Sequence, residues 1–219
     1  MSFSKELYRV KKDDYYSQER MEMLPFVPKG VKTVLDIGCS SGGFGKILKE
    51  NLKCEVWGIE PTEAATEASK HLDKVFYDYF HKDLDFSNKK FDAIIFNDVL
   101  EHLIDPWESL TRCKTLLTPN GCIIASIPNV QCYSVVKDLV FNGHWKYQSS
   151  GILDKTHLRF FTKRSIFDIF SNLGFEIISI EGQNSILKGS RLLRFISFFI
   201  RDRIAPFTFI NYALCARLK

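Results

Sequence analysis

Small and acidic residues meet at the end of the first predicted strand. Asp36 lies within the apolar stretch 34–37, and the turn after it reads Gly38-Cys39-Ser40-Ser41-Gly42. A glycine-rich turn lets the backbone approach a ligand closely, and such turns commonly receive nucleotides. The dinucleotide-binding pattern requires glycine where this chain has Ser40, and Asp36 would repel a pyrophosphate. The turn therefore predicts a nucleoside ligand that carries no phosphates.

A second acid ends the next predicted strand. Glu60 follows Asp36 by 24 residues, which is where nucleotide-binding folds place the acid that binds ribose hydroxyls. Asp36 would attract an ammonium group, the backbone N–H groups of residues 38–42 would meet a carboxylate, and Glu60 would hold a ribose. S-adenosylmethionine carries all three of these groups. NAD would use Glu60 alone.

Groups that can accept a proton follow the fourth predicted strand. Asp98, Glu101 and His102 are spaced three and four residues apart, which places them on one face of a helical turn. They could hold Mg²⁺ or a similar ion. Alternatively, Asp98 caps the turn while the other two orient the loop. We favour the second interpretation and predict no resident metal, with a divalent ion as the open alternative.

A histidine further along the chain is the first candidate for a general base. His157 lies in the stretch KTHLRFF, and an imidazole titrates near neutral pH. His102 and Asp98 are the other candidate catalytic residues. In the alternative interpretation, His157 is structural and pairs with Asp154 or with a backbone carbonyl. Arg159 either binds an anionic acceptor or packs on neighbouring aromatic rings.

Alternating strands and helices must position these residues. Strands are predicted at 33–37, 54–59, 74–77, 91–97, 122–127, 175–181 and 210–218, and helices at 44–51, 61–71, 107–117 and 163–173. This alternation predicts an α/β, Rossmann-like, seven-stranded and mostly parallel sheet with helices on both faces. No compact crossover helix precedes the last strand, so we expect that strand to be antiparallel. The ligand of such a sheet binds at the carboxyl ends of the strands.

Four stretches resemble, in order, the motifs of class I S-adenosylmethionine-dependent methyltransferases. They read VLDIGCSSGGFG, VWGIEP, FDAIIFNDVLEHLIDPW and LLTPNGCIIASIPNV, and the resemblance covers residues 15–182. The stretch GILDKTHLRFFTKRSIFDIFSNLGFEI is similar to a narrower group of bacterial methyltransferases. That group acts in O-antigen, cell-envelope and other saccharide biosynthesis and is similar to the ubiquinone-biosynthesis type.

The resemblance implies a function and a set of cofactor contacts. It implies methyl transfer from S-adenosylmethionine, with S-adenosylhomocysteine as product, to a hydroxyl of a saccharide or similar small metabolite. The implied contacts are Asp36, Gly38, Cys39, Ser40, Gly42, Glu60, Pro61, Asp78, Tyr79 and Asn97. Two of these depart from the family pattern. Ser40 replaces a glycine, and a serine adopts positive φ poorly if the turn requires it there. Asp78 or Tyr79 occupies the position from which an acid usually contacts the adenine.

The length of the chain fits one domain over residues 1–219. Within it we expect an N-terminal helical lid at 1–30 and an acceptor-side insertion at 129–160. A basic and apolar segment, 188–208, precedes the last strand. Its portion 191–203 could lie on an acidic membrane surface or form a dimer face, but a helix buried against the sheet is our preferred interpretation.

Composition narrows the classes of partner and compartment. A net charge of +4 with dispersed basic residues does not indicate nucleic-acid binding. The end of the fourth strand, Asn97-Asp98-Val99-Leu100, lacks the prolines and aromatic ring that grip a flipped base. Six cysteines without a CxxC pair, and no apolar signal region, predict a cytoplasmic protein with reduced thiols, with the inner membrane surface as an open alternative. The rival to an enzyme is a non-catalytic scaffold of the same fold in a glycan-assembly complex.

Overall fold

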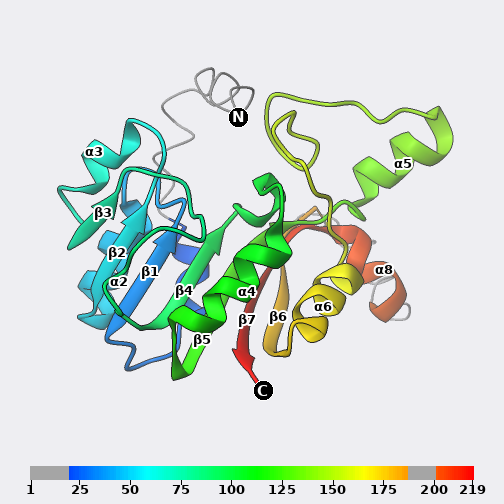
Figure 1. Cartoon of the computed structure of the whole chain (residues 1–219). Helices are drawn as coiled ribbons and strands as arrows, with labels where there is room; N and C mark the ends of the chain where they lie inside the picture. The colour runs from blue at the N-terminus through cyan, green and yellow to red at the C-terminus, as the bar shows by residue number, and fades with distance from the viewer. Residues whose placement is uncertain (1–19, 187–200) are drawn as a thin grey trace.

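The computed structural model describes residues 20–186 and 201–219, with side chains from residue 205 onward in the second range. Within these ranges, seven strands form one sheet in the order β3-β2-β1-β4-β5-β7-β6 (Figure 1). Their bounds are β1 (Thr33–Ile37), β2 (Glu55–Ile59), β3 (Lys74–Phe76), β4 (Phe91–Asn97), β5 (Leu117–Pro128), β6 (Phe175–Ser185) and β7 (Phe209–Leu218). The predicted α/β sheet is confirmed.

The direction of the strands decides where a ligand can bind. Strands β1 to β5 pair in parallel, and β7 runs antiparallel to both β5 and β6. The expectation of an antiparallel last strand is therefore confirmed. The carboxyl ends of β1, β2, β4 and β5 meet at one edge of the sheet, which lies at the top of Figure 1. Asp36, Glu60 and Asn97, predicted near the ends of β1, β2 and β4, therefore lie at this edge.

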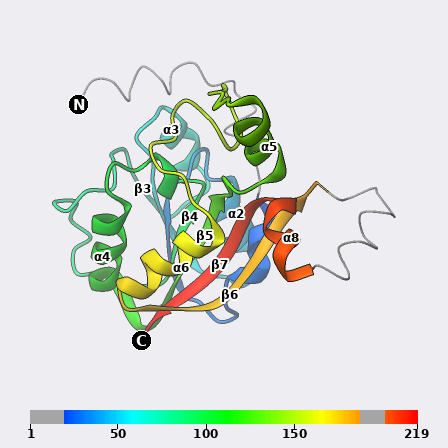
Figure 2. The ribbon, with the colours of Figure 1, turned by 90° about the vertical axis from the view of Figure 1, so that its right-hand side faces the viewer.

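Helices cover both faces of the sheet. Helix α2 (Gly43–Leu52), helix α3 (Ala64–Ala68) and the 3-10 helix η2 (Met21–Phe26) pack on one face. Helices α4 (Pro106–Leu116) and α6 (Lys163–Asn172) pack on the other, as Figures 1 and 2 show. Side chains point to the two faces of the sheet in turn along each strand. Because helices cover both faces, the central strands carry apolar, buried side chains on both sides.

Local chemistry sets the boundaries of α2, α4 and α6 close to those predicted, whereas the helix predicted at 61–71 is the shorter α3, Ala64–Ala68. Asp105 caps α4 by accepting the N–H of Glu108 at 2.9 Å, and Pro106 occupies the first turn. At α6, Thr162 and Ser165 form a reciprocal capping box. Strand β5 begins earlier than predicted, because Leu117 already pairs with Phe91 before an irregularity in the ladder.

The insertion 129–160 contains helix α5 (Tyr133–Asn142), which projects from the body above the carboxyl edge (Figure 1). Helix α8 (Arg201–Thr208) leads into β7. Most of the predicted lid 1–30 and most of the segment 188–208, including most of the proposed membrane contact 191–203, lie outside the described residues. In the part of the chain that is described, no helix is long and apolar enough to cross a bilayer.

Candidate functional site

Main-chain hydrogen bonds tie the glycine-rich turn to the end of β2. The N–H groups of Gly38 and Cys39 both donate to the carbonyl oxygen of Ile59, at 2.8 and 3.1 Å. The N–H of Ser40 donates to Glu60 Oε2 at 3.0 Å. These donors hold the turn itself together. A ligand carboxylate at this turn would therefore need other donors than those three groups.

The turn has left-handed backbone at three positions. The φ angles are 71° at Gly38, 52° at Ser40 and 82° at Gly42. Position 40 thus does require positive φ, and a serine there costs about 1–2 kcal/mol relative to a right-handed conformation. A Cβ atom added at Gly38 would lie 2.7 Å from Val99 Cγ2, so the turn also packs tightly against the loop after β4.

Two acids predicted to bind the cofactor are buried beside this turn. Asp36 is 2% exposed and Glu60 is 5% exposed. Burial first, and then the charge of Glu60, raise the pKa of Asp36 to about 7. The Glu60 carboxylate accepts the N–H and hydroxyl of Thr62, at 2.9 and 2.6 Å. Two neighbouring buried carboxylates favour a cationic ligand, since a positive charge would stabilise the ionised form of Asp36.

The residues predicted to reach an adenine lie on the surface. Tyr79 is 40% exposed. Asp78 accepts the N–H of Tyr79 at 2.7 Å and lies 3.2 Å from His81 Nε2. Pro61 is half-buried between Glu60 and the start of the next loop. Asp78 and Tyr79 are therefore engaged locally after β3.

The end of β4 brings Asn97 and Asp98 to the carboxyl edge. The Oδ1 atom of Asn97 is buried and accepts no hydrogen bond from the described residues. Asp98 has φ 53°, its Oδ1 accepts the hydroxyl of Ser126 at 2.8 Å, and its Oδ2 forms an ion pair with Arg20. Sequence reasoning assigned Arg20 to a lid but did not anticipate this pair, because 78 residues separate the two.

The 3-10 helix η3 (Leu100–His102) is joined to a segment far along the chain. The carbonyl oxygen of Glu101 accepts the N–H groups of Leu158 and Arg159, at 2.8 and 3.0 Å. His102 Nδ1 lies 3.1 Å from the carbonyl oxygen of Thr156. Predicted separately from sequence, His102 and His157 are therefore brought together by the fold.

His157 lies against this helix. Its Nδ1 lies 2.9 Å from the carbonyl oxygen of Ile152, which is the backbone contact of the structural interpretation. Its Nε2 lies 3.9 Å from Glu101 Oε1, and its ring centroid lies 4.7 Å from that of His102. Glu101 is fully buried. The sequence placed Glu101 beside His102, but its spacing gave no sign that it would meet His157.

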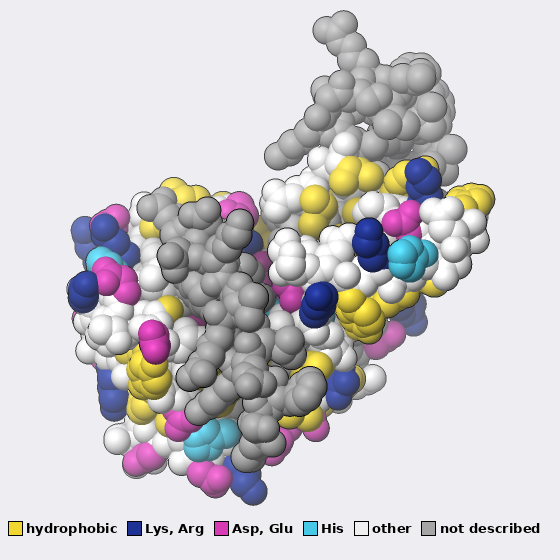
Figure 3. Space-filling view, turned by 90° about the horizontal axis from the view of Figure 1, so that it is seen from above, with side chains coloured by type: hydrophobic (Ala, Val, Ile, Leu, Met, Phe, Trp, Pro, Cys, Tyr) yellow, Lys and Arg dark blue, Asp and Glu magenta, His cyan; other side chains and the backbone are white. Residues whose placement is uncertain are grey.

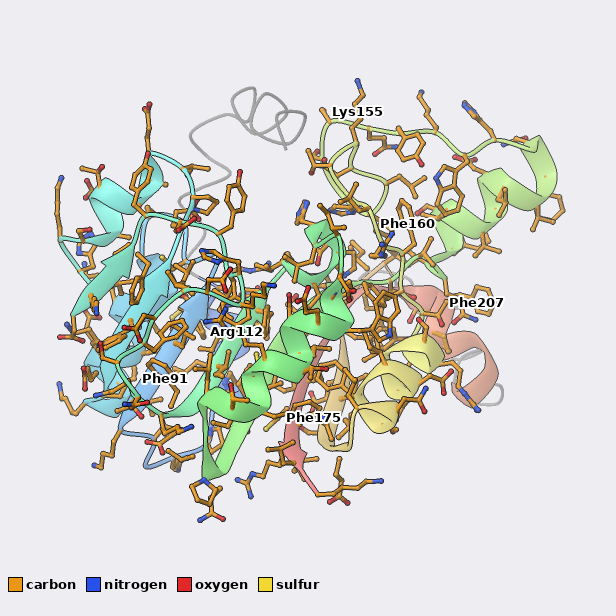
Figure 4. The ribbon with its side chains drawn as sticks, in the orientation of Figure 1. Phe91, Arg112, Lys155, Phe160, Phe175 and Phe207 are labelled. Carbon is orange, nitrogen blue, oxygen red and sulfur yellow. The ribbon has the colours of Figure 1, made fainter. Side chains whose placement is uncertain are left out.

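Arg159 packs on an aromatic ring, one of its two predicted roles. Its guanidinium lies 6.0 Å from the centroid of the Trp107 ring and donates to the carbonyl oxygen of Ile104 at 2.5 Å. Phe160 packs edge-on against Trp145 at 5.1 Å. Figure 4 shows Phe160 between the projecting insertion and the body of the sheet, with Lys155 above it at the rim.

The chain matches the family described as "Methyltransferase domain" over residues 8–180. A ubiquinone biosynthesis O-methyltransferase of Bradyrhizobium diazoefficiens is 34% identical over 106 residues, which cover 44% of this chain and 40% of that protein. Among the curated relatives, matches cover 40% to 65% of the relative's own length. The chain thus spans less than two thirds of the relatives that it matches.

Solved structures share the fold at low sequence identity. A S-adenosylmethionine-dependent methyltransferase from Archaeoglobus fulgidus is 22% identical, with a TM-score of 0.64 over 98% of this chain and 97% of that one. The cyclase SpnF is 16% identical, with a TM-score of 0.61 over 91% of this chain and 80% of that one. The second likeness shows that this fold also carries other chemistry, so the function must be argued from the site.

Proposed function

The chain belongs to the methyltransferase domain family, and from this premise we propose that it transfers a methyl group from S-adenosylmethionine to a hydroxyl oxygen of a small molecule. The fold is that of S-adenosylmethionine-dependent methyltransferases. The observation that carries the proposal is the pair of buried acids, Asp36 and Glu60, at a turn unsuited to phosphates. Curated relatives named as O-methyltransferases support oxygen as the acceptor atom.

Three residues at the carboxyl edge suit the ammonium and ribose groups of the cofactor and one further donor. Asp36 would attract the ammonium of its amino-acid portion, because a cation stabilises a buried carboxylate. Glu60 already accepts three hydrogen bonds, from Ser40 and Thr62, and a carboxylate has about four acceptor sites, so one remains for a ribose hydroxyl. The buried Oδ1 of Asn97 accepts no hydrogen bond from the described residues. A buried acceptor without a donor costs free energy, so a donor group of the cofactor would stabilise it. The cofactor supplies a methyl group already activated on a sulfonium.

The chain's own residues would then orient the acceptor and take its proton. Methyl transfer is an in-line displacement, so much of the rate comes from holding the hydroxyl in line with the methyl group. A hydroxyl must also lose its proton. His157 and His102 are the proposed proton acceptors, because both lie in the loop cluster beside the end of β4. Asp98 is the weaker candidate, since both of its oxygens already bond to Ser126 and Arg20.

We propose a saccharide, or a similar polyhydroxylated metabolite, as the acceptor. Trp145, Tyr147 and Phe160 belong to the insertion 129–160, which overhangs the carboxyl edge (Figure 1). The apolar faces of such aromatic rings could stack on a sugar. The named relatives act in ubiquinone biosynthesis, which makes a phenolic acceptor the competing class. The scaffold interpretation predicts loss of cofactor binding, and the buried Asp36 and Glu60 argue against that loss.

Calorimetry with S-adenosylmethionine and S-adenosylhomocysteine tests the proposal first, with and without Mg²⁺. Micromolar binding at one site per chain is the expected result. Turnover is then screened on nucleotide sugars, lipid-linked sugars and polyprenylated phenols in parallel. Absence of binding in a protein that circular dichroism shows to be folded would favour the scaffold. Activity on phenols alone would overturn the saccharide assignment and leave the methyltransferase assignment intact.

A further inference from the structure

Two buried polar side chains lie in the apolar strands beside the proposed site. Ser126 of β5 is fully buried, and Asn211 of β7 is 6% exposed. The amide of Asn211 donates to the hydroxyl oxygen of Ser126 at 2.9 Å, and that hydroxyl donates to Asp98 Oδ1 at 2.8 Å. We propose that these two side chains are positioning residues of the cofactor site, which hold Arg20 through Asp98 for contact with the carboxylate of the cofactor. The proposal rests on the proposed function, because it assigns a partner to one group of S-adenosylmethionine.

This chain of hydrogen bonds has one direction and crosses β7, β5 and the end of β4, which are neighbours in the sheet (Figure 1). An amide nitrogen only donates and an ionised carboxylate only accepts, so the Ser126 hydroxyl accepts from Asn211 and donates to Asp98. In the antiparallel pairing, Asn211 lies opposite Pro128, two residues along β5 from Ser126. The two polar side chains are therefore diagonal neighbours on one face of the sheet. Each bond in such a chain polarises and strengthens the next.

The same strand also fixes the backbone of Asp98. Its φ is 53°, a left-handed value that is uncommon for residues other than glycine. Its N–H donates to the carbonyl oxygen of Ser126 at 3.0 Å, in addition to the bond between the two side chains. Strained backbone of this kind persists where the surrounding structure over-determines it, and it clusters at functional sites. Ser126 therefore holds both the main chain and the carboxylate of Asp98.

Asp98 in turn holds a cation at the carboxyl edge. Its Oδ2 forms an ion pair with Arg20, whose side chain is 14% exposed. The guanidinium also lies 3.5 Å from Ser126 Oγ through Nη2 and 3.5 Å from Glu22 Oε1 through Nη1. A guanidinium has several N–H donors in a planar fork, so it can bind a second carboxylate beside the first. Fixing a long arginine side chain costs rotamer entropy, and the bonds within the protein offset that cost before a ligand arrives.

The glycine-rich turn lies close to this ion pair. A Cβ atom added at Gly38 would lie 2.7 Å from Val99 Cγ2, and Val99 directly follows Asp98. The N–H groups of residues 38–40 donate within the protein, so the carboxylate of a bound cofactor needs a donor from elsewhere. Asp36 suits the ammonium of the amino-acid portion. Arg20 then suits the carboxylate of the same portion.

The test compares ligands with and without the carboxylate. Calorimetry on the full chain measures affinity for S-adenosylmethionine and for its decarboxylated form. The wild type should prefer S-adenosylmethionine. Ser126→Ala should weaken that ligand about fivefold or more, the scale of one lost hydrogen bond, and leave the decarboxylated form within about twofold. Asn211→Ala should act in the same selective direction, and Ser126→Thr, which keeps the hydroxyl, should bind like the wild type.

The controls separate positioning from general damage to β5. Cys122→Ala removes one buried atom from the same strand and should leave both affinities within about twofold. In an Asp98→Asn background, Ser126→Ala should add no further loss, because Ser126 acts through Asp98.

Three outcomes would overturn the proposal. If Ser126→Ala weakens both ligands equally, or weakens neither in a protein that circular dichroism shows to be folded, Ser126 does not position a carboxylate partner. If the wild type binds both ligands alike, Arg20 does not serve the carboxylate, and the proposal fails while the proposed function stands. If the wild type binds neither ligand, the proposed function fails as well.

Discussion

Asp36 sets the pH range in which the cofactor should bind. Its pKa is raised to about 7 by burial and by the charge of Glu60, so the carboxylate is largely protonated below neutral pH. An ammonium ligand favours the ionised form. We therefore expect affinity for S-adenosylhomocysteine to rise as the pH increases through 7 and then to level off. Calorimetry between pH 6 and pH 8 measures this. Asp36→Asn should remove the pH dependence and weaken binding about tenfold or more at pH 8, and an unchanged profile would contradict the placement of the ammonium.

The same carboxylate should lower the stability of the ligand-free protein at alkaline pH. In the unfolded chain its pKa returns to the ordinary value of 3.8, so between 3.8 and about 7 the folded state holds a proton that the unfolded state lacks. The free energy of unfolding therefore falls as the pH rises through this window and is lowest above it. Thermal unfolding at pH 5 and pH 8 should show a drop for the wild type and a smaller drop for Asp36→Asn. Equal drops would mean that the pKa of Asp36 is not raised.

Glu60 stabilises the turn through its hydrogen bonds and is also the residue that we propose contacts the ribose. Glu60→Gln keeps the shape of the side chain but removes the charge that strengthens each bond accepted from Ser40 and Thr62. Hydrogen bonds to charged groups are worth about 1.5–3 kcal/mol each. We expect affinity for S-adenosylhomocysteine to fall about tenfold or more in calorimetry. The exposed neighbour Glu63 offers a matched control, since Glu63→Gln should bind like the wild type.

At the scale of elements, two residues other than glycine beside α2 have left-handed backbone conformation. Ser40 has φ 52° in the turn, and Lys53 has φ 54° at the C-cap of the helix. Glycine adopts this conformation without the steric cost that other residues meet. Ser40→Gly and Lys53→Gly should each raise the free energy of unfolding by up to about 1 kcal/mol in urea titrations. Ser40→Ala and Lys53→Ala keep the steric cost and should show no such gain. If alanine stabilises as much as glycine, backbone strain is not the cause.

The sequence predicted elements better than it predicted the contacts between them. Apolar runs and turn residues located all seven strands, because period and breakers are local properties. They could not reveal that Arg20 pairs with Asp98, or that Glu101 meets His157. Those contacts join segments that only the order of the strands brings together. The early start of β5 at Leu117 was also missed, because an irregular ladder masks the usual alternation.

At the scale of the whole molecule, the proposed cofactor and acceptor sites occupy different parts of the carboxyl edge. The acids that suit the cofactor follow β1 and β2, whereas the insertion 129–160 overhangs the other side (Figures 1 and 2). Apolar side chains gather on the projecting part in Figure 3, where α5 exposes Leu139, Val140 and Phe141. An apolar surface beside the site is consistent with recognition of a larger acceptor. Within the insertion, His157 and its neighbours contact η3 at the end of β4.

This division predicts which amides the cofactor protects from hydrogen–deuterium exchange. S-adenosylhomocysteine should slow exchange in residues 36–42, 58–62 and 97–102, because binding stabilises the turn and its neighbouring strand ends against local opening. Helix α5 makes few buried contacts, with Val135 its one buried side chain among the described residues. We therefore expect its exchange to stay unchanged on cofactor binding and to slow only when an acceptor is added. Protection of α5 by the cofactor alone would show that the insertion closes over the cofactor, so that the two halves of the site act as one unit.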